Sequence, residues 1–178
     1  MFLVRDGQLN QLRHLFDRHN VKLYNYFVML TGDRSVSEDL TQDVFLRMLR
    51  FRHTFKGEGS FISWMFQIAR NIGVDHYRKN RNFDPLGEKH LHISDEEPTP
   101  LDESIKKQQV EILHQALRTL SPKHREVILM ARFADLSLKE MARILRCPVN
   151  SAKVKVHRAV KALGAIYAEL TEVQQDVV

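Results

Sequence analysis

The sequence predicts an all-α protein built from two small helical domains, and three observations support this fold class. Apolar residues recur at the helical spacings of three and four along most of the chain, and no segment alternates convincingly with a period of two. Serine and glycine residues stand where the periodic segments begin and end. A stretch without apolar periodicity, rich in proline and acidic residues, separates the periodic segments into two groups.

The first domain, residues 1–82, is expected to contain three main helices. The apolar face of the first comprises Leu12, Leu15, Phe16, His19, Leu23, Tyr26, Phe27 and Leu30. Gly32 is placed to end this helix as a left-handed cap. Ser35 and Glu38 then predict a capping box for a second helix over about residues 36–50.

A loop with the sequence FRHTFKGEGS, at residues 51–60, precedes the third helix and combines aromatic, basic and glycine residues. Aromatic side chains on a basic loop can stack on unpaired bases, although Phe55 can equally tuck beneath the loop. Ser60 is the expected N-cap of the third helix, whose outer face carries Gln67, Arg70, Asn71, Val74, Arg78 and Lys79. Such residues suit the reading of base edges, but a basic C-terminus also stabilises any helix.

The linker, residues 83–105, is expected to be extended or partly disordered, because it lacks apolar periodicity. The second domain, residues 106–170, is expected to hold four helices, followed by a short tail at residues 171–178. Within it, Ser121 as N-cap and Pro122 in the first turn predict a helix start.

Residues 137–163 predict two helices joined by a tight turn. Ser137 and Glu140 form a capping box, and Pro148 prevents the first helix from continuing. One face of the next helix is apolar, and the other carries Asn150, Ser151, Val154, Lys155, His157, Arg158 and Lys161. A helix-turn-helix offers such a face to the DNA major groove, although a purely structural helical hairpin also has one apolar and one charged face.

Composition and motifs favour a binding protein over an enzyme. The net charge of +5 and the pI near 9.4 favour a polyanionic partner. We find no glycine-rich phosphate loop, nucleophile motif or metal-ligand spacing, so no cofactor or metal is expected. The acidic residues at 38–43 leave a nuclease as a weak alternative. The single cysteine, Cys147, and the lack of a signal peptide or spanning segment favour the cytoplasm.

Three stretches together resemble a bacterial sigma-70-type RNA polymerase sigma factor of the extracytoplasmic-function (ECF) group. They are SEDLTQDVFLRML at 37–49, FISWMFQIARNIGVDHYRK at 61–79, and LSPKHREVILMARFADLSLKEMARIL with PVNSAKVKVHRAVKAL within 120–163. The resemblance covers about residues 9–170. It implies binding to the β′ and β subunits of core RNA polymerase, recognition and melting of promoter DNA, a stress or envelope-response regulon, and a cognate anti-sigma factor.

The resemblance also implies site residues on three surfaces. The core polymerase-binding surface would comprise Asp39, Gln42, Asp43, Leu46 and Leu49. The reader of the −10 promoter element would comprise Phe55, Lys56, Phe61, Asn71, Arg78 and Lys79. The reader of the −35 element would comprise Asn150, Ser151, Val154, Lys155, Arg158 and Lys161.

Two features keep alternatives open. Considered without the family, the acidic residues near 38–43 would serve to stabilise a helix N-terminus. Arg146 stands where the family often has glycine, so it lies either at a position without positive φ or under mild backbone strain. The alternative function is an autonomous helix-turn-helix regulator that binds an operator without polymerase.

Overall fold

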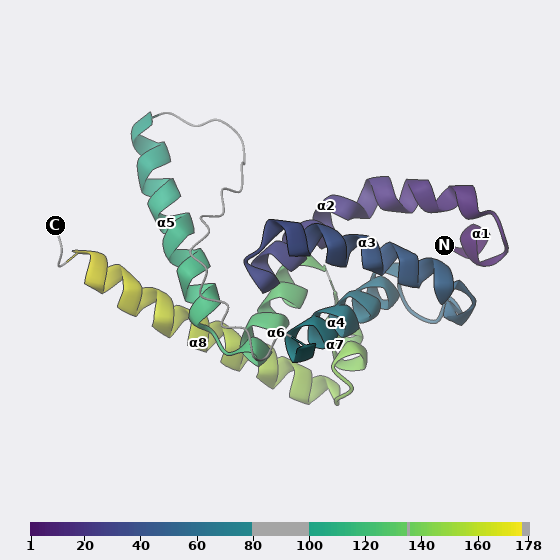
Figure 1. Ribbon diagram of the computed structural model, residues 1–178. Coiled ribbons are helices and arrows are strands. Elements are labelled where there is room, and N and C mark those ends of the chain that lie inside the picture. Colours follow the sequence, from purple (N-terminus) through teal and green to yellow (C-terminus); the bar gives the residue numbers. More distant parts are fainter. Residues whose placement is uncertain (80–99, 135, 176–178) are drawn as a thin grey trace.

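A computed structural model describes residues 1–79, 100–134 and 136–175 (Figure 1). The predicted all-α fold class is confirmed, since the described residues form helices and no strand. Most of the predicted linker, residues 83–99, lies outside the described residues. The elements in order are α1 (Phe2–Arg5), η1 (Leu9–Gln11), α2 (Leu12–Thr31), α3 (Arg34–Arg50), η2 (Arg52–Thr54), α4 (Phe61–Lys79), α5 (Pro100–Thr119), α6 (Pro122–Phe133), α7 (Leu138–Ile144) and α8 (Val149–Gln175).

The N-terminal domain is built from α2, α3 and α4, which pack side by side around an aromatic and aliphatic core. Tyr26 lies at its centre, with its ring edge-on to the rings of Phe27 and Phe66 at 5.2 and 5.4 Å. Gly73 lets α4 approach α2 closely, because a Cβ at that position would lie 2.7 Å from Cδ2 of Leu30. This packing fixes the outward faces of α3 and α4, which carry two of the predicted surfaces.

The boundary between α2 and α3 confirms one predicted cap and corrects another. Gly32 ends α2 in the left-handed region, with φ 73°, as predicted. The N-cap of α3 is Asp33, whose side chain accepts the backbone N–H of Val36 at 3.1 Å. The prediction of Ser35 as the cap is therefore wrong, because an equally good acceptor stands two residues earlier, directly after the glycine turn.

Both ends of the C-terminal domain are more helical than the sequence predicts. Helix α5 begins at Pro100 rather than near residue 105, so the last part of the predicted linker is helical. Proline suits a first helical turn, because it lacks the N–H that would be unsatisfied there. Helix α8 continues to Gln175 through most of the predicted tail. The predicted cap Ser121 is confirmed, since its side chain accepts the N–H of His124.

The helix-turn-helix forms as predicted, with α7 and α8 separated by a sharp turn. The side chain of Glu140 accepts the backbone N–H of Ser137 at 2.8 Å, and Ser137 accepts the N–H of Glu140 in return. Arg146 adopts φ 50° in the turn, which settles its two alternatives in favour of the strained one. A non-glycine residue in this region costs about 1–2 kcal/mol.

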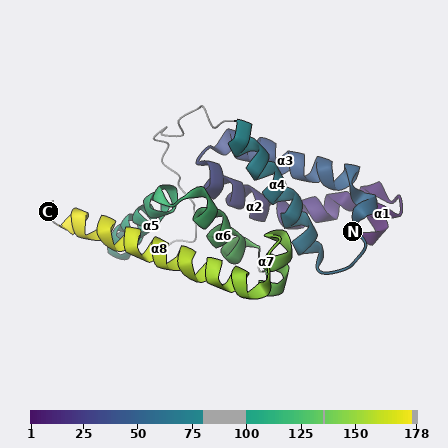
Figure 2. The ribbon, with the colours of Figure 1, turned by 90° about the horizontal axis from the view of Figure 1, so that it is seen from below.

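The two domains pack against each other, with α6 against α2 and α7 against α4 (Figures 1 and 2). One continuous apolar cluster includes Leu23 and Met65 from the first domain and Leu129, Met130 and Met141 from the second. The described parts of the chain therefore share a core.

Replacing Arg146 with glycine should stabilise the protein. Removal of the Cβ relieves the strain of the left-handed backbone conformation. The greater freedom of glycine in the unfolded chain offsets part of this gain. We therefore expect the free energy of unfolding to rise by about 0.5–1 kcal/mol. Chemical denaturation measures the change. Arg146→Ala is the matched control, since it removes the same charge but keeps the Cβ. Equal stability of the two variants would contradict strain as the cause.

Acidification should destabilise the protein in part through His114, which is 5% exposed in α5. Burial, assisted by the nearby Arg118, lowers the pKa of His114 below its ordinary value of 6.5. The unfolded chain therefore binds more protons, and stability falls as the pH drops from about 6.5 towards the lowered pKa. Thermal melts of His114→Gln between pH 7.5 and 5.5 should show a smaller decline than the wild type. The exposed His14, changed to Gln, should keep the wild-type decline.

Candidate nucleic-acid interface

The predicted strip on α3 lies on the outward face of the helix. Asp39 and Gln42 are exposed, and Leu46 is a large apolar side chain with 65% of its surface exposed. Leu49 is half-buried. Polar groups around an exposed leucine are typical of a protein-binding surface.

Asp43 differs from the rest of this strip because its carboxylate is engaged within the domain. The Arg47 guanidinium lies 3.1 Å from Asp43 Oδ2 and 3.4 Å from Asp75 Oδ2. Arg47 thereby bridges α3 and α4 at a partly exposed site, where such pairs stabilise by less than about 1 kcal/mol. Asp43 and Asp75 accordingly have a structural role here, which leaves Asp39 and Gln42 as the polar groups that point away from the protein.

The loop at 51–60 is built around an aromatic cluster. Phe55 is only 6% exposed, and its ring centroid lies 5.0 Å from Phe2, 5.4 Å from Trp64 and 6.2 Å from Phe61. The indole N–H of Trp64 donates to the hydroxyl of Thr54 at 3.3 Å. The loop is thus anchored to α4 from within and covered by α1 from outside.

Phe51 is the exposed aromatic residue of the loop that sequence reasoning missed. Phe51 is 44% exposed, and the guanidinium of Arg50 lies 5.7 Å from the centroid of its ring. A cation beside an open aromatic face suits stacking of a base next to a phosphate. Arg50 and Phe51 are adjacent in the sequence. The sequence at the end of a helix does not indicate which nearby aromatic residue is buried, so Phe51 could not be told from Phe55.

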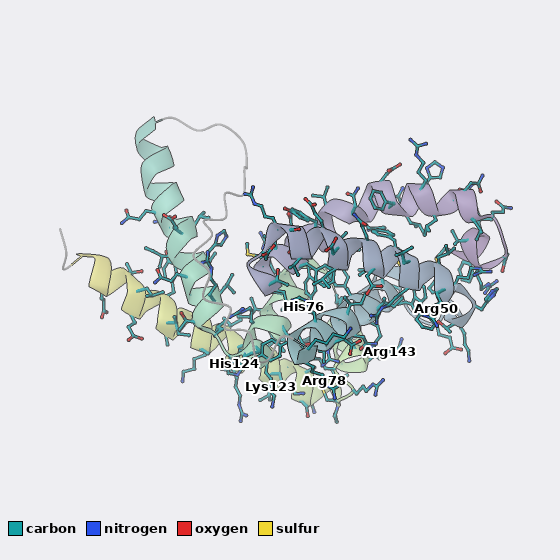
Figure 3. All side chains as sticks on the ribbon, in the orientation of Figure 1. Arg50, His76, Arg78, Lys123, His124 and Arg143 are labelled. Atoms are coloured by element: carbon teal, nitrogen blue, oxygen red, sulfur yellow. The ribbon has the colours of Figure 1, made fainter. Side chains whose placement is uncertain are left out.

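The outer face of α4 keeps three of its predicted polar and basic residues exposed, Asn71, Arg78 and Lys79, whereas Arg70 is largely buried beside Glu126. Asn71 and Arg78 lie seven residues apart, and therefore on the same face, and Lys79 extends the basic end. Arg78 lies near the border with the second domain, where α6 carries Lys123 and His124 (Figure 3). Lys56, in the loop, is also exposed. Exposed basic side chains thus stand at both ends of α4.

The predicted reading face of α8 is open to solvent. Ala152 and Ala159 are fully buried against the domain, which turns the opposite side of the helix outward. The outward residues are Asn150, Val154, Lys155, Arg158 and Lys161, with Ser151 partly exposed. The buried alanines let α8 pack closely on its domain, and the cationic outer face is of the kind that binds DNA phosphates.

Over 1–79, 100–134 and 136–175, no group of three or more His, Cys, Asp or Glu side chains is placed to hold a metal ion. Within the same ranges no helix is long and apolar enough to cross a membrane.

Comparison with known families matches both domains. Residues 15–83 match the family Sigma-70 region 2, and residues 110–163 match Sigma-70, region 4. The ECF RNA polymerase sigma factor SigL of Mycobacterium tuberculosis is 30% identical over 160 residues, which cover 89% of this chain and 90% of SigL. BldN of Streptomyces coelicolor, also named an ECF RNA polymerase sigma factor, is 29% identical over 162 residues. The chain spans 61% of the length of BldN.

Two solved structures share the fold. CnrH, in complex with the cytosolic domain of CnrY, aligns with a TM-score of 0.69 and 21% identity over 93% of each chain. The sigma factor RpoE of Bartonella quintana, in complex with the anti-sigma factor NepR, aligns with a TM-score of 0.66 and 22% identity, covering 86% of this chain and 94% of RpoE. At these identities the likeness supports the all-helical architecture.

Proposed function

This chain belongs to the extracytoplasmic-function group of the sigma-70 family, and we propose that it is the promoter-specificity subunit of a bacterial RNA polymerase. It binds core polymerase, recognises a promoter, and helps to separate its strands. In this role it has no catalytic activity of its own and acts in the cytoplasm, where the polymerase works.

The observation that carries this proposal is the presence of both matched regions, in order, in one chain. A regulator that binds an operator alone needs the helix-turn-helix at 137–163 but has no use for the region matched at 15–83. The exposed Leu46 with its polar neighbours Asp39 and Gln42 gives that region a protein-binding surface. We assign this surface, with Asp43 and Leu49 at its border, to the β′ subunit of the polymerase.

We assign recognition of the −10 element to the loop at 51–60 and the outer face of α4. The residues concerned are Phe55, Lys56, Phe61, Asn71, Arg78 and Lys79, to which the exposed Phe51 is added. Extruding a base from the DNA stack costs a few kcal/mol, which stacking and hydrogen bonds to the base offset. Phe51 has an open ring face, whereas a base can reach Phe55 only after Phe2 moves away.

We assign recognition of the −35 element to α8. Lys155 and Arg158 can reach guanine acceptors or phosphates from the exposed face, and Val154 can contact a thymine methyl group. Asn150, Ser151 and Lys161 lie on the same face and complete the reading surface.

Control by a cognate anti-sigma factor is also part of the proposal, because masking either surface would keep the chain from polymerase. The fold relative RpoE was solved with such a partner. We propose a stress or envelope-response regulon on the basis of the group.

Co-purification with core polymerase and run-off transcription test the function. Core polymerase with this chain should select promoters from a random DNA library, and core alone should not. Within the chain, the double substitution Asp39→Ala with Gln42→Ala should weaken core binding about tenfold, since it removes only outward-facing groups of the docking surface. Its melting temperature should stay that of the wild type. Asp17→Ala, an exposed acidic position on α2, is the matched control for loss of negative charge.

Two outcomes would count against the assignment. A fall in melting temperature with unchanged core affinity would make the acidic face of α3 a helix-stabilising feature only. Tight binding of the free chain to a DNA site, with no effect of added core on transcription, would favour the operator-binding alternative.

Substitution of Arg158 should separate base reading from phosphate binding. If its guanidinium contacts a base, Arg158→Ala costs the holoenzyme about 1–3 kcal/mol and relaxes the preference at one position of the −35 element. Library selection with the holoenzyme measures this preference. Lys161→Ala, at the end of the same face, should instead weaken binding to all sequences alike and lower the salt dependence of binding. Identical behaviour of the two variants would contradict the assignment of Arg158 to a base.

A further inference from the structure

The short helix α1 packs on the outer side of the loop at 51–60. In both views it lies beside the end of α3 and the start of this loop (Figures 1 and 2). The helix is itself held in place, because Val4 is fully buried and Met1 packs against the main apolar cluster. Phe2, between these two residues, is 49% exposed. Helix α1 therefore presents Phe2 to the loop from a fixed position.

The ring of Phe2 contacts the loop at two residues. Its centroid lies 5.0 Å from the ring centroid of Phe55, with 55° between the ring planes. The ring also lies directly over Gly57, since a Cβ at that position would overlap Cζ of Phe2 and lie 3.0 Å from Cε1. The Phe2 ring thus fills the space that a side chain at position 57 would take.

Arg5 adds a polar contact from the other end of α1. Its Nη1 donates to the carbonyl of Phe55 at 3.5 Å, and its guanidinium lies 4.9 Å from the centroid of the Phe2 ring. Asp6 fixes the orientation of this guanidinium by accepting from Nε at 2.7 Å and from Nη2 at 3.3 Å. A hydrogen bond of 3.5 Å is long and contributes little energy. The main effect of Arg5 is therefore to orient the loop and the Phe2 ring relative to each other.

These contacts fall where the fixed part of the loop meets its glycine-rich part. Phe55 is fixed from within, because its ring packs on Trp64. Beyond it, residues 56–60 are exposed, and Gly57 and Gly59 adopt left-handed φ angles of 78° and 96°. Glycine loses more conformational freedom on ordering than any other residue. Support by α1 at this point lowers the cost of keeping the outer part of the loop in one conformation.

We propose that Phe2 and Arg5 are positioning residues for the −10 reader: they hold the loop at 51–60 in the form that receives an unpaired DNA base, without contacting that base. The inference rests on the proposed function, because it concerns the same loop. A loop that is already ordered loses less conformational entropy when it binds. Phe51 and Lys56, on either side of Phe55 in the sequence, are then in place to stack on a base and to meet a phosphate.

The opposite role for Phe2 would be that of a lid, which must leave before a base can bind. Burial of Val4 favours positioning, because α1 cannot move as a whole without taking this side chain out of the core. The two roles differ in the sign of their effect. Loss of the Phe2 ring weakens DNA binding if the ring positions the loop, and strengthens it if the ring is a lid.

Fluorescence of Trp64, the single tryptophan of the chain, reports on the loop in the free protein. Its indole lies 5.4 Å from the ring of Phe55, so a loosened loop admits a small quencher. Phe2→Ala should raise the quenching of Trp64 by acrylamide about twofold. Leu3→Ala is the matched control, because it removes an apolar side chain of similar exposure, 51%, from the same helix. It should leave the quenching at the wild-type level, and the melting temperatures show that both variants fold.

Binding of the holoenzyme to single-stranded DNA tests the effect on the −10 reader. The probe is the −10 sequence that the holoenzyme selects from the random library, as the non-template strand alone. Phe2→Ala should weaken this binding about fivefold to tenfold, because the loop then has to be ordered on binding. The same variant should keep the wild-type affinity for core polymerase and for a duplex that carries only the −35 element.

Phe2→Tyr separates positioning from direct stacking. Tyrosine stacks on bases as phenylalanine does, but its hydroxyl on Cζ has no room over Gly57. A positioning role therefore predicts that Phe2→Tyr weakens binding to the strand as Phe2→Ala does. Wild-type binding by Phe2→Tyr, together with weakened binding by Phe2→Ala, would make Phe2 a base-stacking residue and overturn the proposal.

Gly57→Ala perturbs the same contact from the side of the loop. Its Cβ displaces the Phe2 ring, and alanine is strained at a φ of 78°. In the Phe2→Ala background the displacement no longer matters, and the backbone strain alone remains. The loss of strand binding caused by Gly57→Ala should therefore be about threefold smaller in that background than in the wild type.

Three other results would reject the positioning role. They are unchanged quenching or unchanged strand binding in Phe2→Ala, additive effects of Phe2→Ala and Gly57→Ala, and stronger strand binding by Phe2→Ala, which would make Phe2 a lid. Failure of the proposed function looks different. If Trp64 quenching responds as expected but the holoenzyme selects no promoter sequence, the proposed function fails and the support of the loop by α1 stands.

Discussion

The burial of α6 on two sides is the constraint on which the rest of the structure depends. This helix packs against α8 within its own domain and against α2 of the other domain. Met130 is fully buried, and Arg125 satisfies backbone carbonyls at the ends of α5 and α2. A helix that packs on one side only can tilt or slide against its neighbour. A helix that packs on two sides, as α6 does, fixes the positions of the helices on both sides. The directions of α7 and α8, and therefore of the exposed cationic face of α8, follow from this position.

Local rules predicted most of the elements, because helix ends depend on residues close in sequence. Gly32, Ser121 and Ser137 act as caps, as their positions in the sequence indicate. The rules fail where two candidates compete within one turn. Ser35 satisfies the capping pattern, but Asp33 is closer to the glycine turn and takes the role. The start of α5 at Pro100 was missed because proline and acidic residues suit both a linker and a first helical turn.

Contacts between distant segments were beyond the reach of these rules. Helical periodicity identifies one apolar face, so it did not reveal that α6 also packs against α2 of the other domain. The same limit applies to the loop at 51–60. Its composition leaves open whether Phe55 stacks on bases or tucks beneath the loop, and the ring of Phe2, 53 residues earlier, packs against it. By contrast, the exposure of Asp39 and Gln42 was predictable, since helix geometry alone turns them away from the core.

The polar character of the domain boundary has a consequence for its strength. Desolvation of Arg70 and Glu126 opposes their attraction, so a partly buried pair of this kind adds little net stability while it favours one geometry. An apolar pair of similar size at these positions would hold the domains together more tightly. The ion pair therefore fixes the geometry of this boundary more than it strengthens it.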